Sequence, residues 1–572
     1  MATDRLILVL LTCLLWAGVA TAQTVGQQLP PGMDAGRAIE DMQLPSGQPR
    51  RLPAPKLTLP EVQIPQDRSA KDEDLHFILG SVTLDGNTLL TDQDLDLVVQ
   101  PLLGTPMSVS GLSQLAQALT ALYRSKGYVL ARAELPPQRI ERDGHVRLLA
   151  VEAEIESVQI RGGDPNGEPL IRSYLQSLLH NRSVELERIE NSLLLARDLE
   201  GVAISAELAE GSSPGTVVLI VSVERAATSW QINYDNMNSP YQGLDRFIAM
   251  GQFNNLYGRS DYLRLTAQRA FHTSESTSWS ILQGLMVGEY GERVELSYSD
   301  SVTHPGGKLK PFNLEGTASI GSIIYYLPVQ RSRYFTVRTQ LGLVALNSQQ
   351  TALGASESLY HDRINMMTVG GGVDWQDSVL GGGLSALSLN ADVGLSPNPE
   401  HPSRYKARGQ FVALKYFLNR FQTITDKLSL QLALGGQFAD YPLVSSEQYG
   451  LGAYPFGRGF DISTIAGDQA AAGKIELRYD LTEFFRRVTS PLVSAMSVFA
   501  FHDAGRVWSF YADSASLASS GIGLRGTLDA HPLRNIDKSS LNFDLFVAWK
   551  QYAPAYVNQN SPVVRARVIL NF

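Results

Sequence analysis

Cysteine is almost absent from this sequence of 572 residues. The one cysteine, Cys13, lies in an apolar segment near the N-terminus. The rest of the chain has no thiol, which excludes disulfide bonds, cysteine nucleophiles and cysteine metal ligands there. Lipidation of Cys13 is one alternative, although Thr12 fits poorly before a lipidated cysteine.

Long apolar runs are also missing. The longest covers residues 6–19 and is too short to cross a bilayer as a helix. It follows Arg5 and leads into Ala20-Thr21-Ala22, a small-x-small cleavage pattern. This arrangement predicts a secretory signal peptide over residues 1–22.

Proline is concentrated between residues 23 and 74. Because proline lacks an N–H and fixes φ, this segment is typical of an extended linker. Asp34 is a candidate N-cap for a short helix whose apolar face would carry Ala35, Ala38, Ile39 and Met42. A disordered linker and a linker interrupted by a short helix both stay open.

Residues 75–226 mix strands and helices in an order that occurs twice. The first copy, residues 75–153, has a predicted strand over 76–84, a helix capped by Thr91, a helix capped by Ser110 and ended by Gly127, and strands over 129–135 and 145–151. The second copy, residues 154–226, has a strand over 155–160, helices over 169–179 and 184–198, and strands over 202–208 and 216–223. The repeat predicts two tandem β-α-α-β-β domains.

Helical periodicity disappears in residues 228–572, and strict alternation replaces it. In residues 474–481, Ile475, Leu477, Tyr479 and Leu481 share one face, and Lys474, Glu476, Arg478 and Asp480 share the other. A soluble sandwich also alternates, but so many strands behind a signal peptide favour a membrane barrel with lipid outside and a wet lumen inside. Since backbone groups in lipid must all be paired, the barrel must close.

This pattern predicts a transmembrane antiparallel β-barrel of roughly sixteen strands, at about twenty residues for each strand and its loop. Arginine at Leu477, in lipid, should then cost more stability than arginine at Glu476, in the wet lumen. The last residues agree with a barrel, because one face of the final strand carries Val564, Ala566, Val568, Leu570 and Phe572. An aromatic C-terminus of this kind resembles the terminal strand of bacterial outer-membrane proteins.

Enzymatic interpretations find little support. The segment Gly521–Gly526 matches a nucleotide-binding fingerprint, but no helix follows it, so a strand with small residues is favoured. The histidines of residues 228–572 are scattered without metal-site spacing, and His502 should face away from Asp503. A net charge of −9 argues against a general nucleic-acid binder. We predict no catalytic residue, metal or cofactor, although a barrel phospholipase with a Ser–His pair stays open.

Two segments are unusual for barrel strands and loops. In residues 454–461, two glycines flank Arg458, so the backbone can turn tightly and the guanidinium can project. In residues 501–508, Phe501, Asp503 and Gly505 share a strand face. Spacing alone would leave Arg458 and Asp503 as separate, solvated groups.

A family resemblance links these two segments. The loop motif Gly457, Arg458, Gly459, Phe460 and Asp461 looks like the V/I-R-G-F/Y signature of the POTRA–barrel transporter superfamily. The motif Phe501-x-Asp503-x-Gly505 looks like its companion strand. The resemblance implies a loop folded into the lumen, with Arg458 paired to Asp503. Gly457 departs from the β-branched residue that is usual there.

Other segments resemble one branch, the two-partner-secretion transporters (TpsB; ShlB, FhaC and HecB type). The first-domain motif carries Gly127, Tyr128, Pro136, Pro137 and Gln138, and residues 234–239 and 253–261 resemble the first barrel strands. The resemblance implies POTRA domains over residues 75–153 and 154–226 and a barrel over 228–572. In this family an N-terminal helix often plugs the pore, for which the segment around Asp34 is short.

The resemblance implies a function without catalysis. The POTRA domains would lie in the periplasm and capture an unfolded partner, which the barrel in the bacterial outer membrane exports. The partner would be a TpsA-like adhesin, haemolysin or toxin. Outer-membrane lipid and lipopolysaccharide would surround the barrel, and the barrel-assembly machinery would insert it. The alternatives are an insertase of the same superfamily, a porin and a barrel enzyme.

Overall fold

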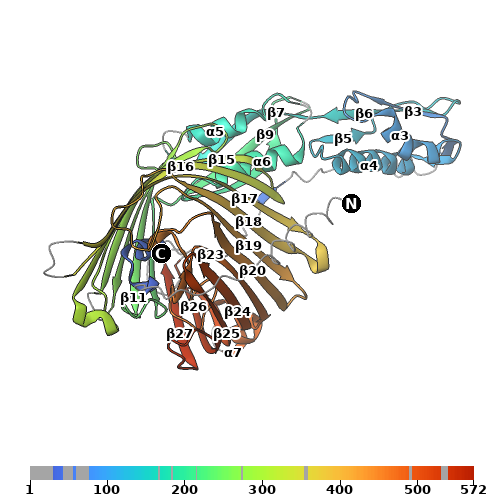
Figure 1. Cartoon of the computed structure of the whole chain (residues 1–572). Coiled ribbons are helices and arrows are strands. Elements are labelled where there is room, and N and C mark those ends of the chain that lie inside the picture. Colours follow the sequence, from blue (N-terminus) through green and yellow to red (C-terminus); the bar gives the residue numbers. More distant parts are fainter. Residues whose placement is uncertain are drawn as a thin grey trace.

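The chain forms a barrel with an elongated arm at one end (Figure 1). The computed structural model describes residues 30–42, 56–58, 76–164, 168–181, 184–213, 215–271, 275–352, 358–488, 492–529 and 539–572. The predicted signal peptide and most of the predicted linker lie outside these residues. In the described part of the chain, no helix is long and apolar enough to cross a membrane.

The outer half of the arm is a small sheet covered by helices. Its sheet has the order β3-β6-β5, and β2 pairs separately with β4. The elements are β2 His76–Ile78, β3 Ser81–Asp85, α3 Asp92–Val99, η2 Gln100–Leu102, β4 Pro106–Ser108, α4 Val109–Ser125, β5 Ala131–Glu134 and β6 His145–Glu152. The core lies between α4 and the sheet, with Leu112, Leu115, Leu119, Val146 and Leu148 fully or almost fully buried.

The helix caps of this half only partly follow the prediction. The Thr91 cap is confirmed, since its hydroxyl accepts from the Asp94 N–H at 3.3 Å and Asp94 returns the bond. The Ser110 cap is wrong. Ser108 caps α4 instead, because its hydroxyl accepts from the free N–H of Gly111 at 3.1 Å. The predicted strand over 76–84 is also wrong as one piece, since it breaks into β2 and β3.

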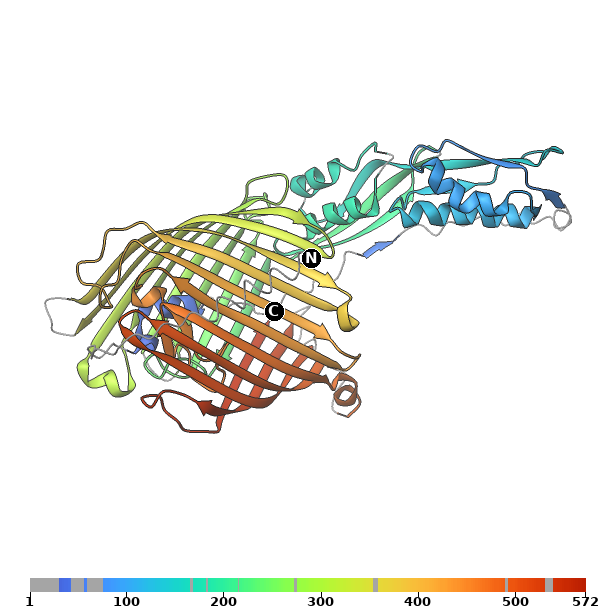
Figure 2. The same cartoon turned by 45° about the vertical axis from the view of Figure 1, so that its right-hand side comes forward.

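The inner half of the arm repeats the order and borrows one strand. Its elements are β7 Glu154–Gly162, α5 Pro169–Gln176, α6 Leu186–Arg197, β8 Val202–Glu210 and β9 Thr216–Arg225. Its sheet has the order β1-β8-β9-β7, where β1 Lys56–Thr58 comes from the linker and runs parallel to β8. The small strand β1 beside the inner half of the arm is visible in Figure 2. Sequence alternation did not predict β1.

The remaining strands close into an antiparallel barrel, which confirms the predicted fold and the expected sixteen strands. They are β10 Thr228–Asp235, β11 Arg246–Asn254, β12 Tyr262–Ala270, β13 Ser276–Met286, β14 Arg293–Thr303, β15 Leu314–Arg331, β16 Phe335–Ala352, β17 Ser358–Asp377, β18 Gly383–Gly394, β19 Val412–Thr423, β20 Leu428–Ala439, β23 Gln469–Asp480, β24 Val493–Ser509, β25 Ala512–Asp529, β26 Ser540–Tyr552 and β27 Val563–Asn571. The first and last strands pair, and Phe572 exchanges backbone hydrogen bonds with Trp230 at 2.7 and 3.0 Å. The C-terminal residue thus helps to close the barrel.

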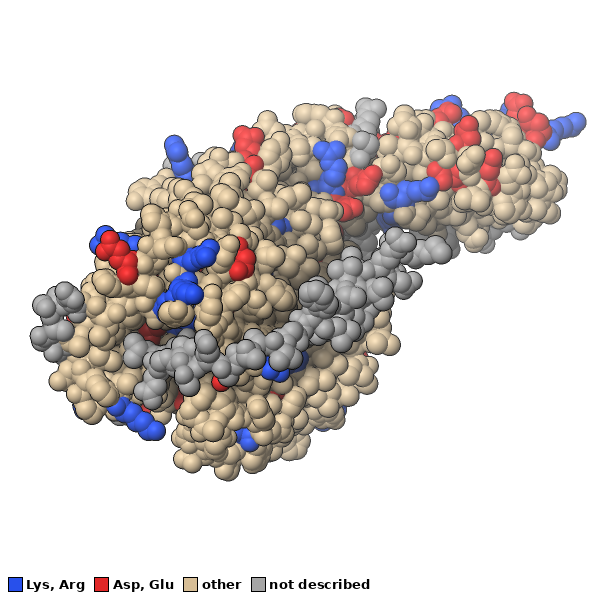
Figure 3. Space-filling view, viewed as in Figure 1, with Lys and Arg blue, Asp and Glu red and all other residues tan. Residues whose placement is uncertain are grey.

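The outer face of the barrel is apolar and its inner face is polar. On β23, Leu477 is 44% exposed whereas its neighbour Glu476 is 0% exposed. On β12, Leu265 faces outward and Gln268 is buried in the lumen. Large parts of the barrel wall in Figure 3 carry no charged side chain, and acidic and basic groups lie closer together on the arm. This polarity suits lipid outside and water inside.

The barrel segment is not free of helices, contrary to the sequence prediction. One α-helix, α7 Thr482–Val488, joins β23 to β24, and short 3-10 turns lie at η3 Gly307–Phe312, η4 Val379–Gly381 and η5 Ser445–Glu447. The helix was missed because seven residues are too few to show a period against the surrounding alternation. Further short elements, β21 Tyr449–Leu451 and β22 Ile465–Gly467, pair within one long loop.

Ion pairs fix the arm on the barrel rim. Arg331, at the end of β15, contacts Asp198 through Nε at 2.6 Å and Nη2 at 3.0 Å. Arg225 holds Glu168 at 2.5 Å and also donates to Ser260, in the first turn on the arm side of the barrel, at 3.2 Å. These contacts join the inner half of the arm to the barrel as one unit.

Arginine in place of Leu477 should destabilise the barrel by about 2–4 kcal/mol near the membrane midplane, and by less toward its edge, because the side chain meets lipid. Glu476 is an unsuitable control, since it lies in a buried ion network rather than in open water. Thr266→Arg, on the lumenal face of β12, is the better match and should cost much less. Folding titrations into lipid vesicles measure both. Equal losses would reverse the assignment of the two faces.

Candidate functional site in the barrel lumen

The loop over residues 440–468, here called the inward loop, connects β20 to β23 and is folded into the lumen. Its side chains Phe456 and Phe460 are each only 1% exposed. They pack with Leu451 of the same loop and with Val507 and Leu517 of the barrel wall. The hairpin of β21 and β22 stiffens the loop from within.

Arg458 is fully buried at the tip of the inward loop. Its Nε and Nη2 donate to the two carboxylate oxygens of Asp503 on β24, at 2.8 and 2.7 Å. The backbone N–H groups of Gly457 and Arg458 donate to the same carboxylate, at 3.3 and 3.0 Å. The remaining Nη1 pairs with Glu476, and the Phe501 ring centroid lies 3.7 Å from Cζ. The guanidinium therefore has a partner on every side, a geometry with high specificity.

The ion network extends beyond the pair implied by the resemblance. Glu476 also accepts from Arg478 at 2.5 Å and from Arg525 at 2.9 Å. Arg525 and Arg567 both hold Asp544, at 2.5 and 2.7 Å. The network thus links the inward loop to five strands, β23 to β27. Sequence reasoning missed Glu476 and Asp544, although the alternation of β23 already placed Glu476 on the lumenal face.

Glycines make room for this arrangement. Gly457 has φ +104°, and a Cβ there would lie 2.8 Å from Leu517, which explains why no β-branched residue stands at this position. Gly521 and Gly523 leave space for the rings of Phe501 and Phe499, which a Cβ would approach to 2.5 and 2.6 Å. The Gly521–Gly526 segment lies inside β25, so the predicted strand is confirmed. Its glycines pack against aromatic rings rather than forming a phosphate loop.

The other motif residues have structural partners. Asp461 accepts from Arg565 of β27 at 2.6 Å. A Cβ at Gly505 would lie 2.7 Å from Leu451, so this glycine allows the inward loop to approach β24. Gly459 donates its N–H to Ser519 at 3.1 Å. Together these contacts extend the surface on which the inward loop packs along β24, β25 and β27.

A short helix, α2 Ala35–Met42, lies inside the barrel behind the turn η1 Pro31–Met33. Asp34 caps it as predicted, accepting from the N–H groups of Gly36 at 2.8 Å and Arg37 at 3.2 Å. The same carboxylate accepts from the Tyr360 hydroxyl of β17 at 2.9 Å. Of the two interpretations of the linker, the helix is therefore the one observed, and Ala35, Ala38 and Ile39 are completely buried in the lumen.

Arg37 fastens α2 to the inward loop. Its Nε and Nη2 donate to the Ser445 carbonyl at 3.0 and 2.8 Å, and Nη2 also reaches the Gln448 carbonyl at 2.8 Å. Nη1 donates to the Ser463 hydroxyl at 3.4 Å. These hydrogen bonds therefore connect the helix and the inward loop to each other inside the lumen.

The first-domain motif residues shape the arm rather than form a catalytic cluster. Gly127 has φ +93°, and its carbonyl accepts from Leu186 of α6 at 2.9 Å, across the junction of the two halves. Gln138 extends the sheet, exchanging hydrogen bonds with the Arg147 backbone at 2.7 and 2.9 Å. Pro136 and Pro137 connect β5 to Gln138, and Tyr128 packs into the cluster around Tyr123.

Tyr123 is held as a hydrogen-bond donor in that cluster. Its hydroxyl lies 2.8 Å from Asn87 Oδ1 and 3.1 Å from Glu152 Oε1, two acceptors that share its one proton. Burial raises the pKa of Tyr123 well above its usual value, and the charge of Glu152 raises it further. The ring therefore stays neutral and fixes α4 to the end of β6.

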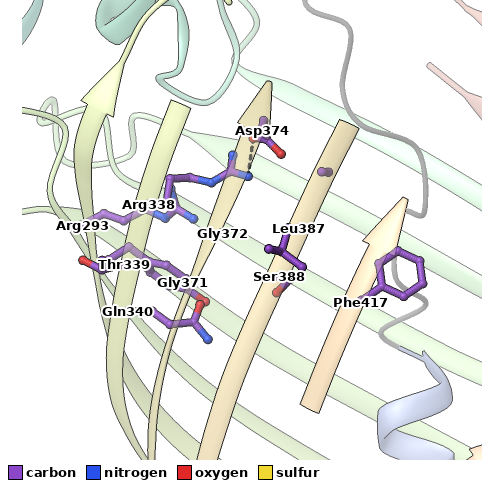
Figure 4. A pocket seen from close by; sticks show the side chains of 12 residues that line it. Arg293, Arg338, Thr339, Gln340, Gly371, Gly372, Asp374, Leu387, Ser388 and Phe417 are labelled. Atoms are coloured by element: carbon purple, nitrogen blue, oxygen red, sulfur yellow. Dashed lines mark ion pairs between the residues drawn. The ribbon is translucent and has the colours of Figure 1, made fainter. Parts of the chain in front are cut away.

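A polar cavity of about 270 Å³ opens in the lumen wall toward the arm end of the barrel. Figure 4 shows Arg338 joined to Asp374 by an ion pair, with Phe417 across the pocket. Gly371 and Gly372 form its floor between these groups. Bare backbone in a strand interior permits the close approach of a second chain.

His502 and Ser520 bear on the enzymatic alternative. His502 faces away from Asp503, as predicted, and its Nδ1 lies 2.8 Å from Ser520 Oγ on the outer face. A hydrolase would also need a group that orients the histidine and donors for an oxyanion. No acidic or amide side chain within the described ranges bonds this ring. The pair is explained by two polar groups that satisfy each other on an apolar surface.

The fold and the lumenal site define a class: a membrane-spanning β-barrel transporter with a two-domain arm. A family model for the haemolysin secretion/activation protein ShlB/FhaC/HecB matches residues 214–526, and a ShlB-type POTRA domain matches residues 77–153. The chain belongs to the ShlB/FhaC/HecB family of two-partner-secretion transporters. Members of this family are outer-membrane transporters rather than enzymes, and they export partner proteins.

Individual relatives agree over most of the chain. The heme/hemopexin transporter protein HuxB of Haemophilus influenzae (strain 86-028NP) is 25% identical over 501 residues, covering 85% of this chain and 86% of the relative. The outer membrane transporter CdiB of Dickeya dadantii is 22% identical over 87% of both chains. The solved structure of CdiB from Escherichia coli has a TM-score of 0.70 at 18% identity, over 96% of this chain and all of that one.

Proposed function

We propose that the arm captures an unfolded secreted partner in the periplasm and delivers it to a lumen that opens when α2 and the inward loop move. The observation that carries this proposal is the combination of an open sheet edge on the arm with two elements, α2 and the inward loop, that lie inside the lumen. The partner would be a large exported protein of the adhesin, haemolysin or toxin type.

The outer half of the arm is the proposed first contact. No described strand pairs with the outer edge of β3, so an extended chain can add there through main-chain hydrogen bonds. The edge of β5 is less open, because the Ala131 and Ala133 N–H groups already bond Tyr128 and Thr120. Three large apolar side chains of this half, Ile78, Leu97 and Leu103, are exposed at 57%, 75% and 37%. Exposed apolar groups on the same half of the arm suit an unfolded polypeptide.

The inner half offers less room for strand addition. The β8 edge already carries β1, which occupies the place that an added partner strand would take. Because β1 and α2 belong to the same linker, withdrawal of α2 and release of β1 can occur together. The partner would then meet the polar cavity at Arg338 and Asp374 on its way through the lumen.

The barrel would lie in the outer membrane between phospholipid and lipopolysaccharide, inserted by the barrel-assembly machinery. An insertase function is the rival within the superfamily. The family match and a two-domain arm favour export.

The double substitution I78D/L97D should weaken binding of the unfolded partner by about tenfold or more, because each buried apolar side chain contributes about 1.5–3 kcal/mol. Binding of the partner's N-terminal region to the purified full-length transporter is the measurement. Gln93→Asp, an exposed change on the same helix, is the control and should bind normally. Unchanged binding by the double variant would move the capture site away from this surface.

A further inference from the structure

The strand order places the helix α7 at the arm end of the barrel. The first strand, β10, leaves the arm and strand directions alternate, so β23, the twelfth strand of the barrel order, ends on the arm side. α7 begins directly after it, with Thr482 N–H bonded to Asp480 at 2.7 Å. The helix therefore forms part of the rim between β23 and β24.

The helix lies on the outside of the wall. It packs against β24, and its Thr482 hydroxyl accepts from the Met496 N–H at 2.9 Å. Met496 and Val498 are two residues apart on β24, so both side chains point to the outer face of the barrel. Met496 is nevertheless only 6% exposed, whereas Val498 is 40% exposed. The outer face of β24 is thus covered where the helix packs and bare in the next outward position.

α7 is amphipathic, and its apolar face is exposed rather than packed on the barrel. Phe484 and Val488, one turn apart, are 57% and 65% exposed. Arg486 lies on the opposite side of the helix and is bonded to Glu483 at 3.0 Å, whereas Arg487, three residues after Phe484, flanks the apolar face. Arg487 is exposed and has no partner among the described residues. An apolar face beside basic side chains is typical of a helix that lies in the interface of a bilayer.

We propose that α7 is an interfacial anchor: Phe484 and Val488 insert into the phospholipid leaflet on the arm side of the membrane, and Arg487 meets lipid phosphates. The apolar face continues the lipid-facing band of β23, where Leu477 and Tyr479 are 44% and 43% exposed. The positive charge complements the headgroups. Naming this leaflet periplasmic rests on the proposed position of the arm, whereas immersion of the helix does not.

The anchor has a consequence for the lumen. α7 connects the strand that carries Glu476 to the strand that carries Asp503, the two partners of Arg458. Lipid contact at this rim would therefore stabilise the β23–β24 hairpin, whose Glu476 and Asp503 bind Arg458 of the inward loop.

A single spin label tests the anchor, because Cys13 is the only cysteine and precedes the predicted mature start. Val488→Cys, Leu477→Cys and Leu97→Cys each place a label at an exposed position, on α7, on the lipid-facing wall and on the arm. The full mature protein is reconstituted in phosphatidylethanolamine/phosphatidylglycerol vesicles, and heat-modifiable mobility confirms folding. Collisions with oxygen, which concentrates in lipid, are compared with collisions with a water-soluble nickel chelate.

The label at position 488 should show the oxygen preference of the Leu477→Cys label. Adding Phe484→Ser should shift the ratio toward the value at Leu97→Cys. A label at 488 that matches the aqueous label at 97 overturns the proposal. So does a ratio at 488 that Phe484→Ser leaves unchanged, since the apolar face would then not drive immersion.

Discussion

Replacing Arg458 with alanine should reduce export of the partner at least about tenfold while the barrel remains in the outer membrane. The substitution leaves Asp503 and Glu476, both 0% exposed, without their shared cation. Removing one member of a buried ion pair costs about 3–5 kcal/mol, enough to displace the seated loop. Asp503→Ala should be nearly as severe, since it removes four hydrogen bonds to the loop.

A double-mutant cycle on export rate measures the coupling. The Arg458→Ala/Asp503→Ala double variant should be scarcely worse than Arg458→Ala alone, because both changes remove the same interaction. Arg420→Ala, which breaks a partly exposed ion pair with Asp377 on the outer face of the barrel, is the control for loss of an arginine ion pair outside the lumen and should export almost normally. Additive losses would show that the two motif residues act independently.

Removing α2 from the lumen should have a large effect on the conductance of the barrel rather than on export. Deletion of residues 31–42 should convert rare channel openings in planar bilayers into a steadily open pore. Arg37→Ala should give frequent openings, because each lost hydrogen bond from a charged donor contributes about 1.5–3 kcal/mol. Arg37→Lys keeps the charge but cannot reach both carbonyls at once, so its opening frequency should lie between those of the wild type and Arg37→Ala.

The conductance of the deletion variant is decisive for the plug. A pore that stays closed without residues 31–42 would mean that the inward loop alone seals the lumen. In that case the contacts of Arg37 with Ser445 and Gln448 would only position the linker.

Local patterns in the sequence were sufficient for the architecture. The alternation of Ile475, Leu477 and Tyr479 against Lys474 and Glu476 predicts which face of β23 meets lipid. The hydroxyl of Thr91 followed by Asp94 predicts a cap from three residues. Ser108 was missed because Ser110 stands equally close to the first apolar turn, and only the free N–H of Gly111 decides between them.

The lumenal site was less accessible, because it depends on contacts between distant segments. Asp503 and Arg458 came from a family resemblance, and spacing alone treated both as solvated. Glu476 and Asp544 lie on strands whose alternation is regular, so nothing local separates them from other lumenal carboxylates. The position of β1 depends on contact with the distant β8 edge, and the position of α2 depends on contact with the barrel interior. Local sequence patterns therefore could not place either element.

Transport by the purified protein is the most direct test of the central claim that the arm captures a partner and the barrel exports it. The transporter is placed in vesicles with the arm outside, the unfolded partner is added without nucleotide, and the fraction protected from external protease is measured. Wild-type protein should protect the partner, whereas a variant lacking residues 75–225, still a heat-modifiable barrel, should protect none. Equal protection by the two proteins would contradict capture by the arm and reduce the molecule to a pore.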